Sequence, residues 1–253
     1  MNKECKGIFF DLGGTFRIVH KDEDYQNQAK RRIAELVGTD ADPIEFHKLL
    51  DQRYEEYRKW ALLTMREAPE AELWTRWLTP EYPKERIAAN ASELTYQYRQ
   101  AKGVRKVVEG GYDVIKELYR RGYTLGIISN LIGCHEVQDW LEEDELTPYF
   151  KSVVLSSVTG LRKPDPAIYL MASREAGVEP EKCACVGDNI SRDIVGGKLA
   201  GYGLNIAVSY PDKPLKKTFS DENRPDAVVE KLIELLDIFP QAPYANLEHF
   251  LNF

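Results

Sequence analysis

Cysteine, long apolar runs and excess basic charge are all scarce in this chain of 253 residues. The cysteines number four, and their spacing matches no paired C-x-x-C zinc pattern. No segment reaches the roughly 20 apolar residues of a membrane-spanning helix, and MNKECKGIFF lacks the apolar run of a signal peptide. With 34 Lys and Arg against 41 Asp and Glu, the net charge is −7, so no basic footprint for nucleic acid is present. We therefore expect a cytoplasmic protein that binds neither nucleic acid nor membranes.

The apolar residues, 43% of the chain, follow two different patterns. Residues 6–12 are typical of a short buried strand, but from about 22 to 101 the apolar spacing is helical. After residue 104, segments with strand and helix patterns alternate, which predicts an α/β fold: a parallel sheet with helices on both faces. We predict a core domain of residues 1–15 and 105–253, and an α-helical cap domain of residues 16–104. The cap would cover the strand ends, where open α/β sheets bind ligands.

Polar residues stand where four of the predicted strands stop. They are Asp11, Ser129 with Asn130, Lys163, and Asp188 with Asp193. Each alone has a structural explanation, since an aspartate after an apolar run is often a turn or cap residue. Together, carboxylates, a lysine and a hydroxyl at one sheet edge suit a phosphate and a divalent cation, and Mg²⁺ prefers a few carboxylates plus water and phosphate oxygens. A carboxylate there can also attack phosphorus.

These motifs resemble those of the haloacid dehalogenase-like (HAD) hydrolase superfamily. FFDLGGT is similar to its first motif, D-x-D-x-T, and LGIISN to the second, an apolar strand that ends in Ser or Thr. GLRKPDPAIY resembles the third, which carries a lysine, and VGDNISRD the fourth, G-D-x-x-x-x-D. The resemblance implies a Rossmann-like core, with the helical cap inserted after the first motif.

The resemblance also implies a role for each matching residue. Asp11 would be the nucleophile, Ser129 and Asn130 would bind the transferring phosphoryl group, and Lys163 would balance charge. Magnesium would be held by Asp11, the Gly13 carbonyl and Asp188. Asp193 would orient Lys163 or a metal-bound water, and Thr15 would support the loop.

Gly13 departs from the family pattern. The phosphatases usually carry a second aspartate here, which protonates the leaving oxygen and then activates water. General acid–base catalysis contributes about 10²–10⁴-fold in rate, so its loss is expected to slow turnover. The predicted function is a magnesium-dependent phosphatase that acts on a small phosphorylated metabolite through an aspartyl-phosphate. The alternatives are a catalytically degenerate HAD-fold binding protein and dehalogenase- or phosphonatase-type chemistry, although the retained Asp188 and Asp193 count against a dehalogenase.

Two further features bear on the substrate. Arg17 and His20 follow the first motif closely and are candidates for substrate contact, with a solvated hairpin as the simpler interpretation. Trp74 and Trp77 lie three apart in ELWTRW, where packing is the simpler interpretation and an aromatic wall around a sugar or base is the alternative. The sequence leaves the oligomeric state and the individual substrate open.

Overall fold

Six parallel strands form the central sheet of the protein. A computed structural model describes residues 4–215 and 219–241. The strands pair in the order β5-β4-β1-β6-β7-β8. Their bounds are Gly7–Phe10 (β1), Thr124–Ser129 (β4), Phe150–Leu155 (β5), Cys183–Gly187 (β6), Leu204–Val208 (β7) and Ala227–Val229 (β8). The α/β fold predicted from the sequence is confirmed, and the first strand of the chain lies in the middle of the sheet.

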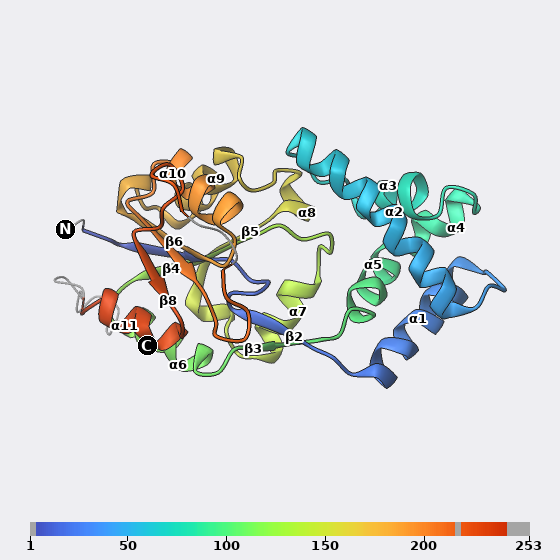
Figure 1. The fold of residues 1–253 in the computed structure, drawn as a ribbon, viewed down its shortest axis with the longest axis horizontal. Coiled ribbons are helices and arrows are strands. Elements are labelled where there is room, and N and C mark those ends of the chain that lie inside the picture. Colours follow the sequence, from blue (N-terminus) through green and yellow to red (C-terminus); the bar gives the residue numbers. More distant parts are fainter. Residues whose placement is uncertain (1–3, 216–218, 242–253) are drawn as a thin grey trace.

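The central strand β1 is buried on both faces, which explains its almost wholly apolar sequence. Ile8 and Phe10 point into one core cluster and Phe9 into another, as the alternation of a strand requires. The first cluster is closed by α6 (Gly111–Arg120), α7 (Glu136–Glu143) and α11 (Leu235–Ile238), and the second by α9 (Pro166–Ala176). Helices therefore cover both faces of the sheet (Figure 1).

A helical segment between β2 and β3 has a hydrophobic core of its own. It comprises α1 (Glu23–Val37), α2 (Pro43–Thr64), α3 (Glu70–Glu72), a π-helical turn (Leu73–Leu78), α4 (Lys84–Ala89) and α5 (Ala91–Gln100). Trp74 is fully buried in that core, where its indole N–H donates to Thr95 Oγ1 at 2.9 Å, and Trp77 packs against Trp60. Packing therefore accounts for both tryptophans. Among the described residues, no helix is long and apolar enough to cross a membrane.

Two short strands that the sequence pattern did not reveal join the helical segment to the sheet. β2 (Arg17–His20) precedes the helical segment in the sequence and β3 (Val104–Val107) follows it. The two strands pair as one antiparallel ribbon. Each has only four residues, two of them polar, and they are far apart in sequence. No local periodicity could indicate this pairing, because it is a long-range contact.

A buried ion pair joins the helical segment to the sheet at a second place. The Glu67 carboxylate, whose side chain has no solvent exposure, accepts hydrogen bonds from Arg162 and from Tyr57 on α2. Ser156, the first residue of α8 (Ser156–Thr159), lies with its hydroxyl 2.6 Å from the same carboxylate. The Glu67 N–H donates to the Gly160 carbonyl at 2.9 Å. In Figure 1, α2 reaches α8 here, well apart from the β2–β3 ribbon. We call this contact the Glu67 junction.

Replacing Glu67 by glutamine should destabilise the protein strongly. The change leaves the Arg162 guanidinium buried without its counter-charge, which typically costs about 3–5 kcal/mol. The matched control is Glu72→Gln, which breaks the exposed ion pair with Arg76 and should cost at most about 1 kcal/mol. Urea denaturation of the two variants measures the difference. Equal losses of unfolding free energy would show that the Glu67 junction does not contribute more than a surface pair.

Candidate active site

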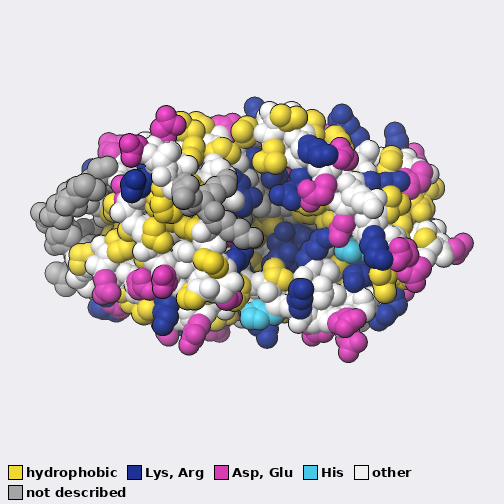
Figure 2. Space-filling model, in the orientation of Figure 1, with side chains coloured by type: hydrophobic (Ala, Val, Ile, Leu, Met, Phe, Trp, Pro, Cys, Tyr) yellow, Lys and Arg dark blue, Asp and Glu magenta, His cyan; other side chains and the backbone are white. Residues whose placement is uncertain are grey.

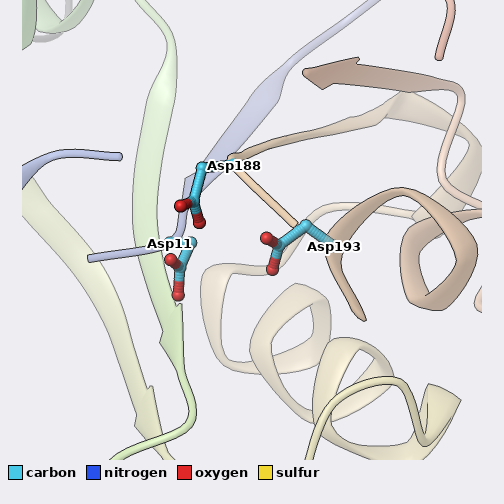
Figure 3. A group of neighbouring side chains, drawn as sticks. All are labelled: Asp11, Asp188 and Asp193. Carbon is cyan, nitrogen blue, oxygen red and sulfur yellow. The ribbon is translucent and has the colours of Figure 1, made fainter. Parts of the chain in front are cut away.

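The predicted site residues meet at the carboxyl ends of the strands. Asp11 follows β1, Ser129 ends β4, and Asp188 follows β6. Asp193 lies in a π-helical turn, Ile190–Ile194, and Lys163 comes from the loop between α8 and α9. Figure 3 shows Asp11 and Asp188 side by side with the carboxylate of Asp193 turned toward them. Parallel strands end at one sheet edge, so residues far apart in sequence are brought together.

The Lys163 ammonium holds these segments in place. Its Nζ donates to Asp11 Oδ1 at 2.6 Å, to Asp193 Oδ1 at 2.6 Å and to the Ile128 carbonyl at 2.8 Å. All three N–H donors of the ammonium are therefore used, and the side chain is only 2% exposed. The Ser129 hydroxyl adds a long hydrogen bond to Asp11 Oδ1 at 3.5 Å.

Burial and charge shift the titration of this cluster. Burial alone would lower the pKa of Lys163, but attraction by Asp11 and Asp193 outweighs it and raises the pKa above its ordinary value. Burial raises the pKa of Asp193 to about 6, and Lys163 opposes that rise. One ammonium is shared between two carboxylates, so the cluster stays rich in negative charge.

Asp188 adds a further carboxylate with an unused oxygen. Its Oδ2 pairs with Lys213 Nζ at 3.1 Å, whereas its buried Oδ1 has no hydrogen-bond partner among residues 4–215 and 219–241. Burial, and after it the charge of Asp11, raises the pKa of Asp188. One oxygen from each of Asp11, Asp188 and Asp193 lies within 4.8 Å of the others. An unpaired buried oxygen among like charges suits a divalent cation, for which carboxylate oxygens are preferred ligands.

The two glycines after Asp11 are not equivalent. Gly14 has φ +90°, and a Cβ there would overlap the Asp188 carboxylate. Gly13 lacks a positive φ, and a Cβ on it would meet no heavy atom of the described chain within 4 Å, its chain neighbours aside. Gly14 is thus required by the backbone and by the approach of Asp188, whereas the position of Gly13 has room for a side chain.

Asn130 and Thr15 support the site through the backbone. The Asn130 side chain accepts from the Lys163 N–H at 2.8 Å and donates to the Lys163 carbonyl at 3.0 Å, so both ends of its amide hold the lysine loop. Thr15 is buried, and its carbonyl accepts from the Tyr210 hydroxyl at 2.6 Å. Phosphate binding by the Asn130 side chain, which the resemblance implies, would have to compete with these two bonds.

A cavity of about 510 Å³ opens in front of Asp11. Gly13, Ser129 and Asn130 line it, and so do the two candidates for substrate contact, Arg17 and His20. Arg17 is mostly buried and pairs with Asp144 at 3.0 Å, whereas His20 is exposed at the end of β2. Sequence reasoning missed several charged residues that line the cavity, namely Arg99, Arg105, Glu136, Asp212 and Lys213, and it also missed Glu67 beside Arg162. They stand in no motif, and long-range folding alone brings them here.

Comparison of the sequence with models of known protein families identifies the family of this chain. The model of the haloacid dehalogenase-like hydrolases matches residues 5–201. The chain belongs to this family. The match begins before Asp11 and ends after Asp193, so it includes the segments that carry all four motifs.

Several curated relatives of this HAD-like hydrolase are named phosphatases. It is 26% identical over 242 residues to the glyceraldehyde 3-phosphate phosphatase of Methanopyrus kandleri, with 92% of this chain and 96% of the relative covered. It is 34% identical to the phosphoserine phosphatase of Thermus thermophilus over 122 residues, which are 48% of this chain and 46% of that protein. Similarity to the first of these relatives therefore runs through both the sheet and the helical segment.

Solved structures share the fold of this HAD-like hydrolase at low identity. A 2-haloacid dehalogenase from Pseudomonas syringae pv. Tomato has a TM-score of 0.66 at 20% identity, with 92% of this chain and 97% of the other covered. A HAD phosphatase from Thermococcus onnurineus has a TM-score of 0.59 at 21% identity, covering 93% and 98%. These similarities support the fold, and one architecture serves proteins named for different reactions.

The two glycines give a matched test of the loop after Asp11. Gly14→Ala should destabilise the protein by about 1–3 kcal/mol, because an L side chain is strained at φ +90° and collides with Asp188. Gly13→Ala should leave the free energy of unfolding nearly unchanged, because its Cβ enters open space. Thermal and urea unfolding measure both. Equal destabilisation by the two changes would contradict this account of the loop.

Proposed function

We propose that this HAD-like hydrolase is a magnesium-dependent phosphatase of small phosphorylated metabolites. The observation that carries the proposal is the Asp11 carboxylate, held at the end of the central strand by Lys163 and Ser129 and open to a cavity. An oxygen of Asp11 attacks the phosphorus of an ester, and the phosphorus–oxygen bond to the leaving group breaks as that oxygen takes a proton from water. Water then attacks the aspartyl-phosphate, which releases inorganic phosphate and restores Asp11.

Asp11, the Gly13 carbonyl and Asp188 are the proposed ligands of Mg²⁺. The unpaired Asp188 Oδ1 supports this assignment. A bound Mg²⁺ supplies charge neutralisation for the phosphoryl oxygens. Lys163 balances the charge of Asp11 and the incoming phosphoryl group, and Asp193 fixes the position of that lysine at 2.6 Å. Ser129 offers a hydroxyl donor to the phosphoryl oxygens.

The helical segment is the proposed cap, with residues 16–104 as its bounds and residues 1–15 and 105–253 as the core. Arg17 and His20 line the cavity at the first of these boundaries, and Arg99 lines it at the second. Relatives named for glyceraldehyde 3-phosphate, phosphoserine and phosphoglycolate favour a small metabolite as the substrate. A cavity of about 510 Å³ falls in the size range of small-molecule sites.

A binding protein with little turnover is the second candidate function. The observation that favours it is Gly13, which offers no carboxylate where family phosphatases carry their acid and base. If the protein is a phosphatase, as proposed, the same glycine slows both the protonation of the leaving group and the attack by water.

Asp11→Asn tests whether turnover depends on the proposed nucleophile. The amide cannot form an aspartyl-phosphate, so hydrolysis of p-nitrophenyl phosphate and of a metabolite panel with Mg²⁺ should fall below detection while the fold persists. The matched control is Asp40→Asn in an exposed loop, which should keep wild-type rates. Turnover by Asp11→Asn within a few-fold of wild type would overturn the proposal. Wild-type protein without turnover on any ester would favour the binding protein.

Gly13→Asp should raise turnover, most of all for substrates with poor leaving groups. The new carboxylate has room, and full recovery of acid–base catalysis is worth about 3–5 kcal/mol of barrier. We expect a smaller gain, because a like charge beside Asp11 and Asp188 raises neighbouring pKa values. Rates on a sugar phosphate and on p-nitrophenyl phosphate measure it, with Gly13→Asn as the control of equal size. A folded, magnesium-binding Gly13→Asp variant that gains nothing over Gly13→Asn would show that the missing acid is not limiting.

A further inference from the structure

The cavity in front of Asp11 is basic, although the chain as a whole is acidic. Its lining includes five cationic side chains and three carboxylates: Arg17, Arg99, Arg105, Arg192 and Lys213 against Asp11, Glu136 and Asp212. Figure 2 shows dark blue side chains gathered in the hollow between the sheet and the helical segment. The net charge of the chain is −7, so this local excess of positive charge does not follow from composition.

Three of the arginines form one cluster where the helical segment meets the sheet. Arg17 comes from β2, Arg105 from β3 and Arg99 from the end of α5, so the cluster is built from the segment boundaries. The three side chains are 13–18% exposed. The Arg17 guanidinium also lies 4.3 Å from the centre of the Trp140 ring. Fixed, mostly buried guanidiniums offer planar donors that match carboxylate and phosphate oxygens.

The cluster has fewer carboxylates than guanidiniums. Glu136 pairs with Arg99 and also lies 3.7 Å from Arg105, so one carboxylate serves two cations. Arg17 pairs with Asp144, but its buried Nε has no hydrogen-bond partner in the described part of the chain. Burial, and after it the neighbouring Arg99, lowers the pKa of Arg105 to about 10. An additional anion at this place would relieve the repulsion.

A purely structural role explains part of the cluster. Arg17 donates to the Arg105 carbonyl at 2.7 Å, and Arg105 donates to the Arg99 carbonyl at 2.9 Å, so these side chains tie the ribbon to α5. Neutral donors could make the same bonds without the cost of burying excess charge. The surplus of positive charge on the wall of the cavity is what a structural role leaves unexplained.

We propose that the arginine cluster binds a second anionic group, so that the preferred substrate is a short phosphate ester whose leaving group carries a carboxylate. This inference rests on the proposed function, because it places the phosphoryl group at Asp11 and the second anion at the arginines that line the same cavity. Arg17, Arg99 and Arg105 determine specificity at a distance from the reacting atoms.

The test compares 3-phosphoglycerate with glycerol 3-phosphate, which share a three-carbon skeleton and differ in the carboxylate. Wild-type kcat/KM should be about 10–100-fold higher for 3-phosphoglycerate, the range expected for charge-assisted hydrogen bonds to one anion. Arg105→Gln should remove most of that preference and leave the rate on glycerol 3-phosphate within a few-fold. Arg105→Lys should keep part of it. Arg120→Gln, an exposed arginine paired with Glu117 on α6, is the control and should change neither rate.

Binding measurements separate failure of this inference from failure of the proposed function. Calorimetry with each compound should show tighter binding of 3-phosphoglycerate to the wild type and near-equal binding to Arg105→Gln, even in a protein that hydrolyses neither. The wild-type comparison needs no variant, so it stands if Arg105→Gln does not fold. Equal binding and equal kcat/KM for the two compounds in the wild type would overturn the inference. So would a preference that Arg105→Gln leaves intact.

Discussion

The Lys163 ammonium is the interaction on which the rest of the site depends. It is a buried cation whose three donors reach Asp11 after β1, the Ile128 carbonyl on β4, and Asp193 after β6. Burying a lysine is costly unless every donor is paired, and here each one is. The Lys163 side chain therefore connects three segments of the chain, and it supplies a positive charge next to the candidate nucleophile, Asp11. The Asn130 side chain fixes the backbone of Lys163, because it accepts from the Lys163 N–H and donates to the Lys163 carbonyl.

Much of this architecture could be read from local patterns in the sequence. The buried strand that precedes Asp11 and the alternation after residue 104 both reflect periodicities that a strand or helix imposes on its own residues. The convergence of Asp11, Lys163 and Asp193 followed from a rule of parallel sheets and not from any local signal. The β2–β3 ribbon and the Glu67 junction could not be predicted, because each depends on pairing between residues far apart in the chain. Nothing in the local sequence distinguishes the buried Glu67 from the exposed glutamates near it.

The loop after Asp11 contains two glycines, and the fold requires only one of them. Gly14 is required by its backbone conformation and by the approach of Asp188, so it reports on structure. Gly13 meets neither demand, so the fold does not require a glycine at that position. The site therefore retains the groups that hold charge, namely Lys163 and the three aspartates, while it lacks a group that moves a proton at Gly13. A Cβ added at Gly13 would meet no clash in the described part of the chain.

The Glu67 junction also limits how the two halves can move. The helical segment is joined to the sheet at the β2–β3 ribbon and again at Glu67. Arg99 at the end of α5 adds a third connection, because it pairs with Glu136 on α7. Arg162, the partner of Glu67, directly precedes Lys163, so the residue that anchors the helical segment and the residue that holds Asp11 are covalent neighbours. A displacement of Glu67 relative to the sheet would therefore act on the backbone next to the charge network around Asp11.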